Sequence, residues 1–268
     1  MQRSDAAFTG SVPEIYDTNL GPMLFEPYAH DMTERVRTGP AARILETAAG
    51  TGRVTRVLAA AFPDAHIVAT DLNAAMIARA QATFDAANVT WHTADMLALP
   101  FDDGSFDVVV CQFGVMFVPN KVAAYREALR ALSPGGRYLF NVWDGLATNP
   151  IPETICTIVE TVLPPGERPF MERTPHGHGD PAAIERDLRA AGFARIDITP
   201  IERRSRCATA RQPAVGIVQG SRQAAQADAA RPGCVPDVIA RVEQALIARF
   251  GDGPIDAPMR AFVIEARR

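Results

Sequence analysis

Apolar residues along the chain fall into short runs separated by stretches of helical periodicity. The runs predict seven strands, at residues 43–46, 66–70, 89–93, 106–113, 137–142, 193–201 and 258–267. Between most of them, apolar side chains recur every three or four residues, as on one face of a helix. Alternating strands and helices predict a mostly parallel sheet with right-handed crossovers.

Two runs show where their strands lie in that sheet. Residues 106–113 are almost unbroken apolar sequence, which is typical of a parallel strand covered on both faces, so we place this strand beside the first. Residues 193–201 alternate Ile196 and Ile198 with polar side chains, so we expect a half-exposed strand.

The remaining segments predict helical additions to one sheet domain at 41–268. Residues 1–40 predict an N-terminal helical cap with a break at Gly21-Pro22, and cap insertions are expected near 145–180 and 208–256. Within the second insertion, residues 208–232 are rich in Ala and Gln. We expect them to be poorly buried and to act as a mobile lid.

The chain is organised around R-I-L-E-T-A-A-G-T-G, residues 43–52, a strand that breaks into a turn before a helix. Gly50 and Gly52 allow a sharp bend and a close approach to a ligand. A dinucleotide fingerprint read from Gly50 would need Gly or Ala at position 55, where Thr55 stands. The turn therefore predicts a different nucleotide-like ligand on a doubly wound, Rossmann-like α/β sheet.

The segment E-x-A-x-G-x-G from Glu46 resembles the first motif of the class I S-adenosylmethionine (SAM) dependent methyltransferases, with Ala48 where that family most often has glycine. T-A-D-M-L-A-L-P-F, residues 93–101, resembles the branch that contains ubiquinone and menaquinone biosynthesis methyltransferases (methyltransferase type 11). Together with D-D-G-S-F-D-V-V, residues 102–109, the resemblance covers roughly residues 43–142.

The resemblance implies a cofactor, SAM, which becomes S-adenosylhomocysteine (SAH), and a set of residues that bind it. Asp71 would accept from the ribose hydroxyls, Leu72 would pack on adenine, and Asp95 and Met96 would bind its polar edge. The backbone carbonyl of Gln112 would hold the methionine ammonium. The implied cofactor-binding residues are Glu46, Ala48, Gly50, Gly52, Asp71, Leu72, Asp95, Met96 and Gln112.

The sequence leaves the identity of the catalytic residues open. Tyr16 is a candidate to flank the sulfonium, because aromatic faces favour a cation, or it is a core aromatic. His176 and His178 form an H-x-H loop. A metal site there would need Asp180 as a further ligand, but Asp180 is better placed to begin a helix, so the loop favours a base in a substrate pocket over a metal site. We predict no metal.

The composition limits the kinds of partner that we expect. The formal net charge is −4 and no basic block is present, so nucleic acid is not an expected partner. The first ten residues lack the apolar core of a signal peptide, and no apolar run reaches membrane-spanning length. The four cysteines are far apart, as expected of free thiols. We predict a cytoplasmic monomer or homodimer.

The predicted function is transfer of the methyl group of SAM to a small, partly apolar molecule. The segment after the fourth strand lacks the N-P-P-Y type tetrapeptide of methyltransferases that act on nucleic-acid bases or glutamine. The alternatives are a SAM-binding regulatory protein without transfer activity and an NAD(P) oxidoreductase. Whether O, N, C or S accepts the methyl group stays open.

Overall fold

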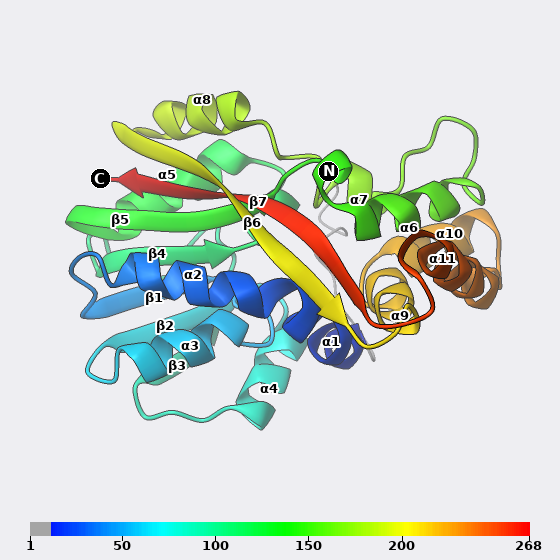
Figure 1. Cartoon of the computed structure of the whole chain (residues 1–268). Coiled ribbons are helices and arrows are strands. Elements are labelled where there is room, and N and C mark those ends of the chain that lie inside the picture. The colour runs from blue at the N-terminus through cyan, green and yellow to red at the C-terminus, as the bar shows by residue number, and fades with distance from the viewer. Residues whose placement is uncertain (1–11) are drawn as a thin grey trace.

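The computed structural model describes residues 12–268 and contains a seven-stranded sheet (Figure 1). Its strand order is β3-β2-β1-β4-β5-β7-β6, and only β7 runs antiparallel to its neighbours. The strands are β1 (Arg43–Thr47), β2 (His66–Asp71), β3 (Val89–Thr93), β4 (Phe106–Gln112), β5 (Leu132–Trp143), β6 (Arg195–Cys207) and β7 (Ile255–Arg267). The predicted doubly wound, mostly parallel α/β sheet is confirmed.

Helices cover both faces of the sheet, as the apolar strands require. The helices α2 (Glu26–Val36) and α3 (Arg53–Ala61) pack together on one face, where Ile44, Val108 and Val110 are buried beneath them. On the other face lie α5 (Lys121–Ala131) and α8 (Pro181–Ala191), while α4 (Ala74–Thr83) packs against β2 and β3. As predicted, β4 lies beside β1 with both faces covered, because its central residues are fully buried.

The N-terminal segment is one continuous helical rod, so the predicted break at Gly21-Pro22 is wrong. It consists of α1 (Val12–Ile15), a π-helix η2 (Tyr16–Phe25) and α2. Pro22 has no backbone N–H to donate, and the wider turn absorbs this loss: the Glu26 N–H donates to the Gly21 carbonyl, five residues back. Of the predicted cap at 1–40, residues 1–11 lie outside the described part of the chain, and α2 packs on the sheet.

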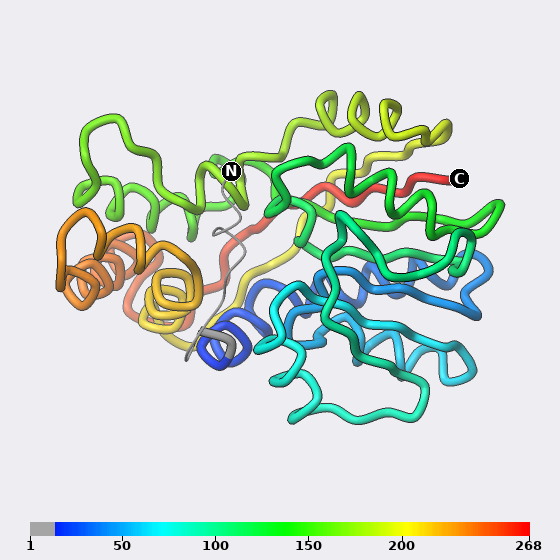
Figure 2. The backbone as a smooth tube through the Cα atoms, turned by 180° about the vertical axis from the view of Figure 1, so that it is seen from behind, coloured from blue at the N-terminus to red at the C-terminus, as the bar shows by residue number. Residues whose placement is uncertain are grey.

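A helical layer lies beyond the sheet, at the end reached by the long strands β6 and β7 (Figures 1 and 2). It contains α6 (Pro150–Glu160), α7 (Phe170–Arg173), α9 (Arg211–Gln219), α10 (Gln223–Ala230) and α11 (Val235–Phe250). Two short 3-10 turns, η3 (Val115–Phe117) and η4 (Leu146–Thr148), follow β4 and β5. The helix α9 packs against η2, α6 and α11. This layer therefore joins the two predicted insertions to the N-terminal rod.

The expectation that residues 208–232 are poorly buried is wrong. The inner faces of α9 and α10 bury Ala214, Ile217, Val218 and Ala227 completely or nearly so. Small side chains pack closely between helices, so an Ala-rich stretch is compatible with a tightly packed layer. No helix within residues 12–268 is long and apolar enough to cross a membrane.

Candidate functional site

A cavity of about 270 Å³ opens at the carboxyl ends of β1, β2 and β4. This is the edge at which doubly wound sheets bind ligands. One side, here called the polar half, is lined by Asp71, Leu72, Asn73, Met76, Ala94, Asp95, Met96 and Leu97. The other side, the aromatic half, is lined by Tyr16, Gln112, Phe113, Gly114, Phe117, Val118 and Pro119. Ala48 and Gly50 lie between the halves.

The two turn glycines serve different needs. Gly50 has φ +57°, and a Cβ added there would meet no atom within 4 Å, so this residue keeps space free in the cavity. Gly52 has φ +80° and lines no cavity; a Cβ there would lie 2.7 Å from the Trp91 ring. Gly52 thus allows close packing of the turn on β3, and only Gly50 leaves room for a ligand.

Thr55 occupies the position of the third glycine of a dinucleotide fingerprint. It is fully buried, and its hydroxyl donates to Glu46 Oε2 at 2.6 Å. A side chain with a polar partner therefore fills the space that the third glycine of that fingerprint leaves empty.

The Asp71 carboxylate is built into the turn. Its Oδ2 accepts from the Gly50 N–H at 2.9 Å, and its Oδ1 accepts from the Asn73 N–H at 2.8 Å. Burial raises the pKa of Asp71, and these hydrogen bonds oppose that rise because they favour the charged form. Asp71 lines the cavity and also ties the ends of β1 and β2 together, a structural role that sequence spacing did not reveal.

The polar half continues from Asp71 along the turn after β3. Leu72 is 50% exposed and is the one large apolar side chain described as exposed in residues 12–268. Asp95 Oδ1 accepts from the Leu97 N–H at 2.9 Å, which fixes the turn that contains Met96. A flat apolar ring with polar edges would cover Leu72 and meet the remaining acceptor sites of Asp95, so this half fits the adenosine part of SAM.

The aromatic half contains a residue with a strained backbone, Phe113, directly after β4. Phe113 has φ +52°, and only Ala48, at φ +53°, is another non-glycine residue with positive φ among those described. The Phe113 N–H donates to Asn141 Oδ1 at 2.8 Å, and its ring stacks on Trp143 with centroids 3.9 Å apart. Strained backbone in two cavity-lining residues is typical of functional sites.

A second, smaller cavity adjoins the main one beneath the N-terminal rod and is here called the narrow extension. It shares Tyr16, Ala48, Gly50 and Gln112 with the main cavity and is also lined by Phe25, Glu46, Ala49, Thr51, Arg53 and Val54. The Gln112 Nε2 donates to the Phe25 carbonyl at 3.0 Å, while its buried Oε1 has no partner. An unpartnered buried acceptor favours a ligand that brings a donor.

Two ionisable groups beside this extension have shifted pKa values. Burial raises the pKa of Glu46 to about 8. The neighbouring charge of Asp71 adds to this rise, and the Thr55 hydrogen bond opposes it. Burial, with the charges of Asp71 and Asp17 adding to it, raises the pKa of Tyr16 well above its usual range. Tyr16 therefore stays protonated at neutral pH and stacks on Phe25 with centroids 4.9 Å apart.

The two loop histidines are not in this site. The Nδ1 of His176 lies 2.7 Å from the Asp144 carbonyl, and His176 lines a separate small cavity behind Trp143. The Nε2 of His178 lies 3.2 Å from the Tyr125 hydroxyl. Burial lowers the pKa of each to about 4, and they face different partners. Within residues 12–268 no group of three His, Cys, Asp or Glu side chains is arranged to hold a metal ion.

Comparison with known proteins identifies the domain that carries this cavity. A family model described as a methyltransferase domain matches residues 44–136. A ubiquinone/menaquinone biosynthesis C-methyltransferase of Methylobacterium nodulans is 42% identical over 102 residues, which are 36% of this chain and 40% of that protein. Over this segment the chain is similar to the class I SAM-dependent methyltransferases.

Two further similar proteins extend the comparison. An uncharacterized protein of Mycobacterium tuberculosis is 40% identical over 100 residues, 37% of this chain and 36% of that protein. The match thus spans 36–40% of the length of these two curated relatives. The solved phosphoethanolamine N-methyltransferase 2 of Haemonchus contortus, bound to phosphomonomethylethanolamine and S-adenosylhomocysteine, has a TM-score of 0.59 at 18% identity, covering 97% of this chain and 58% of that chain. At this identity the likeness shows the fold alone.

Seven of the nine cofactor residues predicted from the sequence line the main cavity: Ala48, Gly50, Asp71, Leu72, Asp95, Met96 and Gln112. Glu46 lines the narrow extension, and Gly52 lines neither. Sequence reasoning missed Arg53, Phe113 and Phe117. Arg53 follows the glycine turn directly, a position that could have drawn attention to it, whereas Phe117 had no distinguishing signal.

Proposed function

We propose that this protein binds SAM in the main cavity and transfers its methyl group to a small, partly apolar molecule. The observation that carries the proposal is the cavity itself, in which seven residues of the family's motifs meet around the open space at Gly50. In this proposal Asp71 holds the ribose, Leu72 and Asp95 hold adenine, and the methionine end enters the narrow extension.

Methyl transfer mainly requires that the protein position the acceptor against the methyl group of SAM. SAM supplies an activated methyl group on a positively charged sulfur. The aromatic half, with Tyr16, Phe113 and Phe117, would exclude water and hold the acceptor in line with that group. Alignment of two reacting atoms can supply roughly 7–11 kcal/mol of a reaction barrier. Tyr16 would act as a hydrogen-bond donor or an aromatic face, because its raised pKa keeps it protonated.

The composition of the lining supports an acceptor with an apolar body. The acidic side chains among the lining residues, Asp71 and Asp95, both belong to the polar half. The aromatic half offers apolar surface from Phe113, Phe117 and Val118, besides the polar groups of Tyr16 and Gln112. A strongly anionic acceptor would find no cationic partner in the lining of the main cavity, so a molecule without a phosphate group is favoured.

A SAM-binding regulatory protein without transfer activity is the main alternative, and an NAD(P) oxidoreductase is a weaker one. The buried Thr55–Glu46 hydrogen bond at 2.6 Å disfavours the latter, because it fills the position of the third fingerprint glycine. We also propose a cytoplasmic monomer or homodimer. The four buried free cysteines support this location, because disulfides are rare in reducing compartments.

The first experiment titrates the purified protein with SAH and, separately, with NADH, followed by calorimetry. SAH binding at micromolar or lower Kd with no NADH binding is expected; the reverse would contradict the proposal. The second experiment incubates the protein with methyl-labelled SAM and a panel of uncharged phenols, amines, thiols and quinols. Labelled product from a panel member would distinguish an enzyme from an inactive SAM-binding protein.

A further inference from the structure

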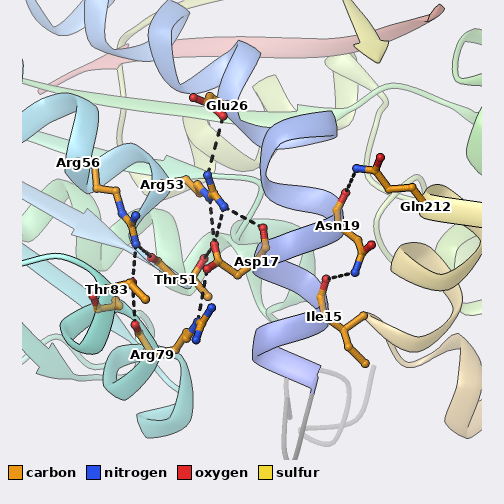
Figure 3. Close-up of polar contacts among 11 residues, drawn as sticks. Ile15, Asp17, Asn19, Glu26, Thr51, Arg53, Arg56, Arg79, Thr83 and Gln212 are labelled. Carbon is orange, nitrogen blue, oxygen red and sulfur yellow. Dashed lines mark hydrogen bonds and ion pairs between the residues drawn. The ribbon is translucent and has the colours of Figure 1, made fainter. Parts of the chain in front are cut away.

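A buried carboxylate of the N-terminal rod lies among Thr51, Arg53 and Arg79 (Figure 3). Asp17 of η2 is 6% exposed. Its Oδ1 accepts from the Thr51 hydroxyl at 3.1 Å and from Arg53 Nε and Nη2 at 3.0 and 2.8 Å. Its Oδ2 lies 3.4 Å from Arg79 Nε. One carboxylate thus joins the rod to the glycine turn, α3 and α4.

Arg53 is the residue through which this contact reaches the narrow extension. It is the one cationic residue in the lining of that extension, where Glu46 and Gln112 Oε1 also lie. Besides Asp17 Oδ1, its Nη2 donates to the Asp17 carbonyl at 2.8 Å, so the guanidinium is fixed along two edges. Its Nη1 makes a long contact of 3.8 Å with Glu26. A cation with one weakly engaged amino group favours an additional anionic partner.

A second observation shows that the rod is shaped around this guanidinium. A Cβ added to Gly21 would lie 2.6 Å from Arg53 Nε and 2.7 Å from Nη2. Gly21 is helical and has no left-handed φ to require glycine, so the close approach of Arg53 accounts for its small size. The helix therefore has both an acceptor, Asp17, and a gap, Gly21, at the place where Arg53 lies.

We propose that Asp17 is a positioning residue that holds Arg53 in the narrow extension, where Arg53 pairs with the α-carboxylate of the cofactor's amino-acid end. This inference rests on the proposed function. An amino-acid group is zwitterionic, and the extension has complementary chemistry: Arg53 for the carboxylate, and Glu46 with Gln112 Oε1 for the ammonium. The polar half would recognise adenosine independently of Asp17.

The test compares SAH with 5′-methylthioadenosine, which keeps the adenosine and the sulfur but lacks the amino-acid group. Calorimetry would give both Kd values for wild type, Asp17→Ala and Arg53→Met. Loss of a hydrogen bond to a charged group should weaken SAH roughly 10- to 100-fold in either variant. The Kd of methylthioadenosine should change by less than about twofold. The double variant should be no weaker for SAH than the single ones, because both act through one guanidinium.

Gly21→Ala tests this role without removing either charged group. The added methyl must push Arg53 away from Asp17, and the better helix propensity of alanine, roughly 1 kcal/mol, offsets part of the stability that is lost with their hydrogen bonds. SAH should again weaken while methylthioadenosine does not. This variant and Arg53→Met keep the inference testable if Asp17→Ala does not fold.

Asp31→Ala is the matched control. Asp31 also joins two arginines, Arg35 at 2.8 Å and Arg203 at 2.6 Å, and lies on the next helix, α2, but it lines neither the main cavity nor its extension. It should leave both Kd values unchanged. If the Asp17, Arg53 and Gly21 variants weaken both ligands equally, or neither, the inference is overturned. If wild type binds neither ligand, the proposed function itself fails.

Discussion

The two halves of the main cavity differ in how their side chains are held. In the polar half, Asp71 and Asp95 bond to backbone N–H groups two residues further along the chain. In the aromatic half, Tyr16 comes from the N-terminal rod, Phe113 from the end of β4, and the Trp143 ring that supports Phe113 from the end of β5. The first half is a set of local turns, whereas the second exists only when distant segments pack together.

The comparison with relatives separates the two halves only in part. The matched segment, residues 44–136, contains the polar half and residues 112–119 of the aromatic half, while Tyr16, Trp143 and the helices beyond the sheet lie outside it. A local turn can be retained as a short motif, because its geometry depends on few residues. A wall assembled from several segments can change with any of them. We therefore expect cofactor binding to be the shared property and acceptor choice the individual one.

The largest effect expected from a single substitution is at Asp71. If its carboxylate accepts from the ribose hydroxyls, Asp71→Ala should weaken SAH by roughly 2–4 kcal/mol, or about 30-fold to nearly a thousandfold. Because Gly50 and Asn73 lose their acceptor, the free energy of unfolding without ligand should also fall by about 1–3 kcal/mol. Calorimetry with SAH and chemical denaturation measure the two effects.

Asp85→Ala is the control for Asp71. This residue is exposed and lies in the loop after α4. Both the Kd of SAH and the unfolding free energy should stay at their wild-type values. Loss of stability in Asp71→Ala with unchanged SAH affinity in the folded fraction would show that the residue only holds the turn.

A second effect, on stability, should distinguish Glu46 from Asp71 by its dependence on pH. The unfolded chain loses the Glu46 proton near pH 4.5, and the folded protein near pH 8. Its contribution to stability is thus fully present below about pH 4.5 and is lost as pH rises through about 8. Glu46→Gln keeps an acceptor for Thr55 and cannot ionise, so at pH 9 the variant should be more stable than wild type by about 2–4 kcal/mol.

Denaturation of wild type and Glu46→Gln at pH 6.5, 7.5 and 9 measures this difference. These pH values lie at or above 6.5. Between pH 6.5 and 4 both proteins lose stability, because His176 binds a proton in the unfolded chain near pH 6.5 and in the folded protein only near pH 4. The gap between the two proteins should widen with pH. Parallel stability curves would mean that Glu46 is ionised in the folded protein at neutral pH.

The smallest effect concerns the strained residue between the two halves. Ala48 adopts φ +53°, a conformation that suits glycine better than any residue with a Cβ. Ala48→Gly should raise the unfolding free energy by about 0.5–1 kcal/mol, after the entropy lost by glycine is taken into account. A rise in melting temperature of about 1–4 °C is expected. A lower melting temperature would mean that the Ala48 methyl contributes more by packing than it costs in strain.

Much of the fold and of the polar half could be predicted from the sequence. Residues 106–113 are apolar throughout, and they form the strand beside β1. Asp180 was expected to begin a helix, and its carboxylate accepts from the Ala182 N–H at 3.0 Å at the start of α8. The family resemblance implied Glu46, Asp71 and Asp95, and each of them lies at or just after the carboxyl end of a parallel strand. These features depend on backbone geometry within a few residues, which residue type and spacing specify directly.

Other features were decided only by the tertiary structure. Gly21-Pro22 is an ordinary helix breaker, yet packing against α9 and β6 keeps the rod continuous with a π-helical turn. His176 and His178 are two residues apart, yet one contacts the Asp144 carbonyl and the other the Tyr125 hydroxyl. The ion pair of Asp17 with Arg53 joins segments whose contact no spacing rule describes. Such contacts depend on which helix faces meet after the core has formed, and the same local sequence is compatible with several outcomes.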